Sequence, residues 1–75
     1  MRKLDDTEMT VMRTILRLGA VKGDLLSIAH DSKRTVAETI DVINYLKREG
    51  FLNEIDRRYF LSEEGAYTVG RKILK

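Results

Sequence analysis

The segment Ser32–Leu52 constrains the fold more than any other part of this 75-residue chain. It combines a helix-start signal, apolar residues at helical spacing, a glycine stop and the first residues of a strand. Either Ser32 or Thr35 can serve as the helix N-cap, and with Thr35 as the cap Glu38 completes a capping box. We therefore predict a helix over about residues 33–49 that leads into a strand.

The side chains of this helix predict a buried face and an outer face. The apolar residues that recur at helical spacing, and are expected to be buried, are Val36, Ile40, Ile43 and Leu46. The residues on the opposite face are Arg34, Glu38, Asp41, Tyr45 and Arg48, with Ala37 and Asn44 beside them. The outer face is therefore mostly polar and is expected to meet solvent or a partner.

Two shorter helical patterns precede this segment. The first covers about residues 5–18, where Asp5 begins a capping box and Gly19 follows as a stop. The second covers about residues 24–30, with Asp24 as its N-cap. The N-terminal part of the chain is thus expected to form two helices that support the third.

Two β-rich runs and one further helix complete the chain. The runs flank the polar turn Asp56-Arg57-Arg58, which predicts a hairpin over about residues 51–61. A last helix over about residues 62–74 follows, with Ser62 as its N-cap. We predict one domain over residues 1–75, mainly α with a small β-hairpin, in the order helix, helix, helix, strand, strand, helix.

Composition argues against several classes of protein. The chain has one histidine and no cysteine, and it contains no Gly-rich phosphate loop, so we expect no catalytic residues, no metal and no cofactor. We do not expect a chain this short to enclose a typical ligand cavity of about 300 Å³ or more, which argues against a small-molecule substrate. It has neither a run of about 18 apolar residues nor a secretory signal, so we expect a cytoplasmic protein that does not contact a membrane. The formal charge of +2 permits binding to nucleic acid without requiring it.

The segment DLLSIAHDSKRTVAETIDVINYLKREGFL resembles the winged helix-turn-helix of small bacterial and archaeal transcriptional regulators of the MarR-like and ArsR-like kind. That pattern has a Leu-x-x-x-Ala helix, a serine in the turn, a Thr-Val pair that opens the recognition helix, and a Leu-x-x-x-Gly exit into the wing. The matching positions are Leu25 to Ala29, Ser32, Thr35-Val36, and Leu46 to Leu52. The segment RRYFLSEEG also resembles the return strand of the wing, so the resemblance covers nearly the whole chain.

The resemblance implies sequence-specific binding of double-stranded DNA by a small transcriptional regulator. Its third helix would enter the major groove, and its wing would reach the DNA backbone or the minor groove. The implied DNA-binding residues are Ser32, Lys33, Arg34, Thr35, Ala37, Glu38, Thr39, Arg57 and Arg58. Winged helices also act as protein-binding modules, so the alternative is a protein–protein interaction within a transcription, replication or other assembly.

Two carboxylates on the outer face of the third helix qualify this interpretation. Glu38 and Asp41 would repel phosphate, unless Glu38 accepts a hydrogen bond from a cytosine amino group. Alternatively, both are surface residues, with Glu38 paired to Arg34 and Asp41 paired to Lys47 or Arg48. In either case the DNA contacts are expected nearer the start of the helix.

The last helix carries two apolar rows. The row that can close the core is Ala66, Val69 and Ile73. The second row is Tyr67, Gly70 and Leu74, and it predicts a homodimer interface. Such a dimer would hold two recognition helices about 34 Å apart on a palindromic site. The alternative is a monomer whose core takes up both rows.

Overall fold

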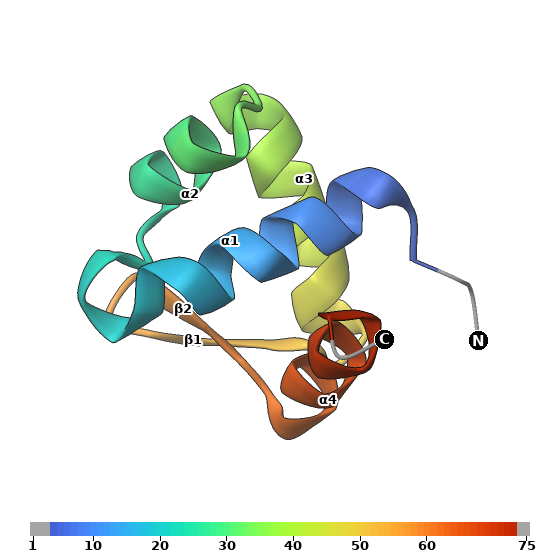
Figure 1. Cartoon of the computed structure of the whole chain (residues 1–75). Coiled ribbons are helices and arrows are strands. Elements are labelled where there is room, and N and C mark those ends of the chain that lie inside the picture. The colour runs from blue at the N-terminus through green and yellow to red at the C-terminus, as the bar shows by residue number, and fades with distance from the viewer. Residues whose placement is uncertain (1–3, 74–75) are drawn as a thin grey trace.

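The computed structural model describes the backbone of residues 4–73 and the side chains of residues 4–19 and 22–70 (Figure 1). Within this range the elements are α1 Asp6–Lys22, α2 Leu25–Ser32, α3 Val36–Arg48, β1 Leu52–Ile55, β2 Arg58–Leu61 and α4 Glu63–Ile73. This order confirms the predicted sequence of three helices, a hairpin and a last helix. Helix α1 contacts α2, α3, α4 and β2, and it therefore organises the core. None of the described helices is both long enough and apolar enough to cross a membrane.

Helix α1 begins at the predicted capping box. The Glu8 backbone N–H donates to Asp5 Oδ1 at 2.7 Å, and the Asp5 N–H donates to Glu8 Oε1 at 2.9 Å. The regular part of the helix ends near Leu18, as predicted. Gly19 has a left-handed φ of 71° and interrupts the helix, which then continues to Lys22. Glycine adopts this conformation without steric cost, so Gly19 ends the first stretch of helix and kinks the chain before the last turn of α1.

Helix α2 starts at the predicted cap, where Asp24 Oδ1 accepts the Ser27 N–H at 2.8 Å. It ends at Ser32, and Lys33 follows in the left-handed region with φ 60° and ψ 39°. The N–H of Arg34 donates back to the Ala29 carbonyl at 3.0 Å. These bonds satisfy the last carbonyls of α2 and turn the chain sharply.

Helix α3 begins at Val36, and Thr35 is its N-cap. Glu38 N–H donates to Thr35 Oγ1 at 3.0 Å, and Glu38 Oε1 accepts the Thr35 N–H at 3.1 Å. Of the two predicted caps, Thr35 is therefore confirmed and Ser32 is wrong. The helix starts later than residue 33, and the turn between α2 and α3 is formed by residues 33–35.

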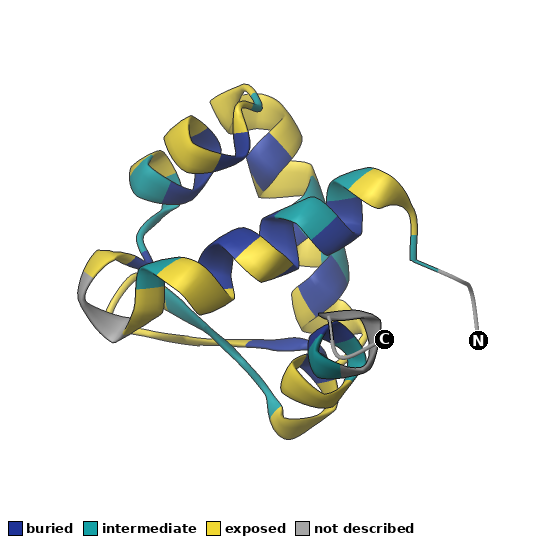
Figure 2. Cartoon of the chain, viewed as in Figure 1, coloured by how far each residue is buried: buried dark blue, intermediate teal, exposed yellow. Residues whose placement is uncertain are grey.

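The buried face of α3 differs from the predicted one. Ile43 and Leu46 are buried as expected, but Val36 and Ile40 are each 40% exposed and Thr39 is fully buried in their place. The Thr39 hydroxyl donates to the Thr35 carbonyl at 2.8 Å, so this polar group is buried without losing a hydrogen bond. Figure 2 shows the buried segments of α1, α2 and α3 turned toward one another. The buried apolar cluster consists of Met9, Val11, Met12, Ile15, Ile28, Ile43, Leu46, Phe51, Leu52 and Val69.

The hairpin has a two-residue turn. Ile55 pairs with Arg58, and the turn residues Asp56 and Arg57 both have positive φ, 52° and 63°. This is the backbone pattern of a type I′ turn, formed here without glycine or asparagine. Arg58 therefore begins β2 instead of lying at the tip, and it forms a β-bridge with Asp24.

Helix α4 packs tightly on the residues that follow α3. Its predicted cap is confirmed, since Ser62 Oγ accepts the Gly65 N–H at 3.1 Å and donates to the Gly50 carbonyl at 2.6 Å. The Ser62 N–H also donates to the Phe51 carbonyl at 2.9 Å. A Cβ atom on Gly65 would lie 2.2 Å from that same carbonyl oxygen. Glycine is thus required where α4 crosses Phe51.

Candidate nucleic-acid interface

The turn between α2 and α3 brings two basic residues together. The Lys33 side chain is exposed. Arg34 is half-buried, and its guanidinium donates to Thr7 Oγ1 of α1 at 3.5 Å. Both precede Thr35, the N-cap of α3, where the Glu38 N–H is bonded to Thr35 Oγ1 and the Glu38 carboxylate is held by Thr35. The turn therefore presents positive charge beside the first turn of α3.

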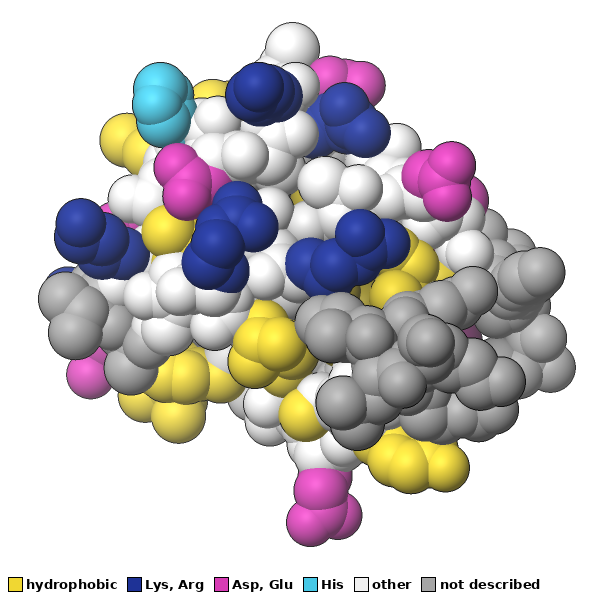
Figure 3. Space-filling model, in the orientation of Figure 1, with side chains coloured by type: hydrophobic (Ala, Val, Ile, Leu, Met, Phe, Trp, Pro, Cys, Tyr) yellow, Lys and Arg dark blue, Asp and Glu magenta, His cyan; other side chains and the backbone are white. Residues whose placement is uncertain are grey.

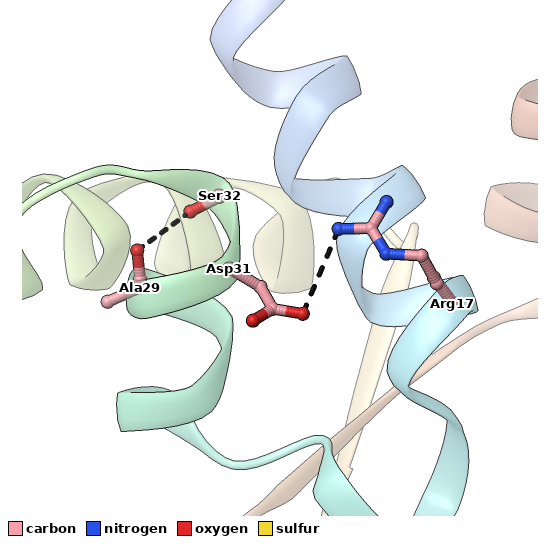
Figure 4. A network of polar contacts seen from close by, with 4 residues as sticks. All are labelled: Arg17, Ala29, Asp31 and Ser32. Atoms are coloured by element: carbon pink, nitrogen blue, oxygen red, sulfur yellow. Dashed lines mark hydrogen bonds and ion pairs between the residues drawn. The ribbon is translucent and has the colours of Figure 1, made fainter.

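Two of the predicted DNA contacts are buried. Ser32 is 5% exposed, and its hydroxyl donates to the Ala29 carbonyl at 3.3 Å (Figure 4). Thr39 is fully buried and bonded to Thr35. Their hydroxyls complete the packing of α2 and α3 instead of facing outward. The prediction that these two side chains contact DNA is therefore corrected.

Glu38 is held at the cap of α3. Its carboxylate accepts from the Thr35 N–H and from the Thr35 hydroxyl, both at 3.1 Å. These two bonds, the backbone one first, lower the pKa of Glu38 below its usual value, and the positive charge of Arg34 adds a smaller effect. Glu38 is therefore ionised at neutral pH and oriented toward Thr35. This is a third role, distinct from the cytosine contact and from the Arg34 pair considered above.

The predicted partners of Asp41 make other contacts. Lys47 Nζ lies 2.6 Å from Glu54 Oε1, and this hydrogen bond raises the pKa of Lys47. The Arg48 guanidinium lies 6.0 Å from the centre of the Tyr45 ring. Lys47 therefore ties α3 to β1. Asp41 itself is exposed on the outer side of α3, so negative charge remains one turn beyond Ala37.

Asp31, close to the basic turn, is paired with Arg17 of α1. Arg17 Nη2 and Asp31 Oδ2 are 3.9 Å apart, and Figure 4 shows the two side chains directed toward each other across the gap between α1 and α2. Arg17 thus places a positive charge beside Asp31. Figure 3 shows Lys and Arg side chains spread over the middle and upper part of the view in Figure 1, with Asp and Glu side chains among them.

The arginines of the hairpin lie at the opposite end of α2. Arg57, in the turn, lines a shallow depression with Asp24, Leu25, Leu26 and Ser27. The pKa of Asp24 is lowered, first by the hydrogen bonds from Ser27 and then by the charge of Arg58. The eight residues of α2 span about 12 Å at 1.5 Å per residue, with Lys33 and Arg34 after its C-terminal end and Arg57 and Arg58 near its N-cap Asp24.

The outer surface of α3 contains two residues that were assigned to the core. Val36 and Ile40 are exposed, together with Ala37, Asp41 and Asn44. A signal for the true buried face was present, because positions 39, 42, 43 and 46 have complete i, i+3, i+4, i+7 spacing. Thr39 conceals this spacing, because threonine is a polar residue and does not belong to an apolar pattern.

The predicted dimer surface on α4 is described in part. Tyr67 is 64% exposed and Gly70 is half-buried, while Leu74 lies outside the described residues. Ala66, assigned to the core row, is exposed. The side chain of Val69 is fully buried. A groove of about 210 Å³ borders Ala66, and it is lined by Ile15, Leu16, Gly19, Tyr59, Phe60, Leu61 and Ala66.

No protein-family model matches the sequence, and no curated protein matches it. Among the side chains that the structure describes, no group of three or more His, Asp or Glu residues is arranged to hold a metal ion. The function must therefore be inferred from the surfaces described above.

Proposed function

We propose that this protein is a winged helix-turn-helix regulator that binds double-stranded DNA through the start of α3. The observation that carries the proposal is the exposed surface of Val36, Ala37 and Ile40, which directly follows the basic turn at Lys33 and Arg34. In a helix-turn-helix, the N-terminal residues of the second helix contact base edges. The proposal includes a cytoplasmic location and no enzymatic activity.

The basic residues at the two ends of α2 support the backbone contacts that such binding needs. Lys33 and Arg34 lie at its C-terminal end, and Arg57 and Arg58 lie at its N-terminal end. We expect these side chains to contact phosphates, which fix the orientation of a protein on the duplex. The hairpin turn contacts the start of α2, so the wing formed by β1 and β2 is short. We expect this wing to contact the DNA backbone.

The carboxylates of α3 define how far the interface extends. Glu38 and Asp41 are both exposed, and the Glu38 carboxylate is held at the cap of α3 by its hydrogen bonds with Thr35. Phosphate is repelled by an exposed carboxylate. The DNA backbone is therefore expected near Lys33 and Arg57, and away from Glu38 and Asp41.

The proposal is tested by titrating a fluorescent duplex of mixed sequence at several salt concentrations. The logarithm of the association constant should fall linearly with the logarithm of the salt concentration, by about 0.9 for each phosphate contacted. Lys33→Ala should reduce the magnitude of this slope by about 0.9. Arg48→Ala is the matched control, because Arg48 lies at the other end of α3 against Tyr45 and should leave the slope unchanged. A lack of binding at low salt would refute the proposal.

A homodimer is the second part of the proposal, and the exposed apolar surface of α1 and α4 favours it. Leu16 is 49% exposed at the groove beside Ala66, and Tyr67 is 64% exposed on α4. Burying this surface between two copies would remove apolar area from water. Sedimentation equilibrium should give twice the chain mass of 8.7 kDa, and Leu16→Glu should give the monomer mass. A wild-type mass of one chain at micromolar concentration would contradict the dimer.

A further inference from the structure

Helix α3 buries a threonine and exposes a valine and an isoleucine. Thr39 has no exposed surface, whereas Val36 and Ile40 are each 40% exposed. Burial of apolar side chains is the main favourable term in folding. Leaving Val36 and Ile40 partly exposed therefore stabilises the fold less than burying them would. The exposed pair is thus a feature that the packing of the monomer does not explain.

The two apolar side chains form one small surface on α3. At 100° per residue, Val36, Ile40 and Lys47 lie within about 40° of one another around the helix axis. Lys47 is bonded to Glu54 of β1, so this side of α3 faces the hairpin. Val36 is the first residue of α3, and Ile40 lies one turn later. The pair therefore lies between the basic turn at Lys33 and the hairpin.

The size and surroundings of this surface favour DNA over a protein as its partner. A stable protein interface buries about 800 Å² on each partner, far more than two partly exposed side chains supply. The neighbouring Ala37 is small and lets the helix backbone approach closely, and Lys33 supplies charge suited to phosphate. Apolar side chains that lie between phosphate-contacting residues need an apolar group of DNA to contact. The C5-methyl group of thymine is such a group, and it is exposed in the major groove.

We propose that Val36 and Ile40 contact thymine methyl groups and so select A·T pairs within each half-site. This inference rests on the proposed DNA binding. Each methyl group that is buried against such a side chain should strengthen binding about fourfold. Two contacts should give a preference of roughly fifteenfold over DNA that lacks the methyl groups.

The test compares two alternating duplexes of roughly 24 base pairs, long enough for two half-sites one helical turn apart. One is made of adenine and thymine and the other of adenine and uracil, so that they differ in the methyl groups alone. The wild-type protein should bind the thymine duplex roughly fifteenfold more tightly. Val36→Ala and Ile40→Ala should each lower this ratio, and the double variant should bring it close to one. The ratio is measured on one preparation, so a partly unfolded variant does not distort it, and the single variants suffice if the double variant fails to fold.

Two control variants separate methyl recognition from general binding. Leu26→Ala removes an apolar side chain of α2 that is 70% exposed, and it should leave the ratio unchanged. Lys33→Ala should weaken binding to both duplexes and preserve the ratio. Equal wild-type affinities, or a thymine preference that the Val36 and Ile40 variants retain, would overturn the inference while DNA binding stands. If neither duplex binds at low salt, the proposed function fails as well.

Discussion

Gly65→Ala is expected to lower the free energy of unfolding by about 3 kcal/mol or more, or to prevent folding. The added Cβ would lie 2.2 Å from the Phe51 carbonyl oxygen, far inside van der Waals contact, and 3.4 Å from Met12 Cε. The carbonyl cannot move freely because it accepts the Ser62 N–H at 2.9 Å. The free energy of unfolding is usually about 0.05–0.15 kcal/mol per residue, which gives roughly 4–11 kcal/mol for a chain of this length.

Urea denaturation followed by circular dichroism measures this effect, with Gly70→Ala as the matched control. Gly70 lies in the same helix, and a Cβ atom there meets nothing within 4 Å. Alanine is the better helix former, so Gly70→Ala should stabilise the protein by up to about 1 kcal/mol. Equal stabilities for the two variants would show that α4 does not cross Phe51 as described.

Ile43→Ala is expected to cost about 2–5 kcal/mol of unfolding free energy, because it leaves a cavity in the core. Ile43 is 2% exposed, and it packs in the buried cluster with Leu46 and Ile28. Ile40→Ala removes the same atoms from the same helix, at a position that is 40% exposed. Less apolar area is buried there, so we expect a cost of roughly 1 kcal/mol.

The comparison of these two isoleucine variants tests the orientation of α3 directly. Thermal or urea unfolding of both proteins gives the two costs under identical conditions. If Ile40→Ala lowered the free energy of unfolding as much as Ile43→Ala does, Ile40 would be buried, as the apolar pattern predicts. That result would also remove the exposed surface on which the thymine inference rests.

The order of the elements was predictable because it depends on short-range chemistry. Asp5, Asp24 and Ser62 were identified as N-caps, and each accepts the N–H three residues later. Such bonds involve neighbours in the chain, so the sequence contains all the information that they need. The glycine after α3 and the polar turn of the hairpin are local signals of the same kind.

The candidate site was less predictable because it depends on contacts between elements. Thr39 is buried because its hydroxyl is satisfied within the helix, which an apolar pattern does not reveal. Lys47 binds Glu54 across from α3 to β1 instead of pairing with Asp41. Arg58 leaves the hairpin tip because a turn of positive-φ residues forms at Asp56 and Arg57. Of these three differences, the burial of Thr39 removes a side chain from the expected DNA contacts.

The central claim is that the start of α3 and the turn before it contact DNA. The most direct test is the amide chemical-shift change of the ¹⁵N-labelled protein when an alternating adenine–thymine duplex is added at low salt. We predict the largest changes at residues 33–40, smaller changes at residues 56–58, and little change in α4. Changes concentrated on Leu16 and α4, or no changes at saturating duplex, would contradict the claim.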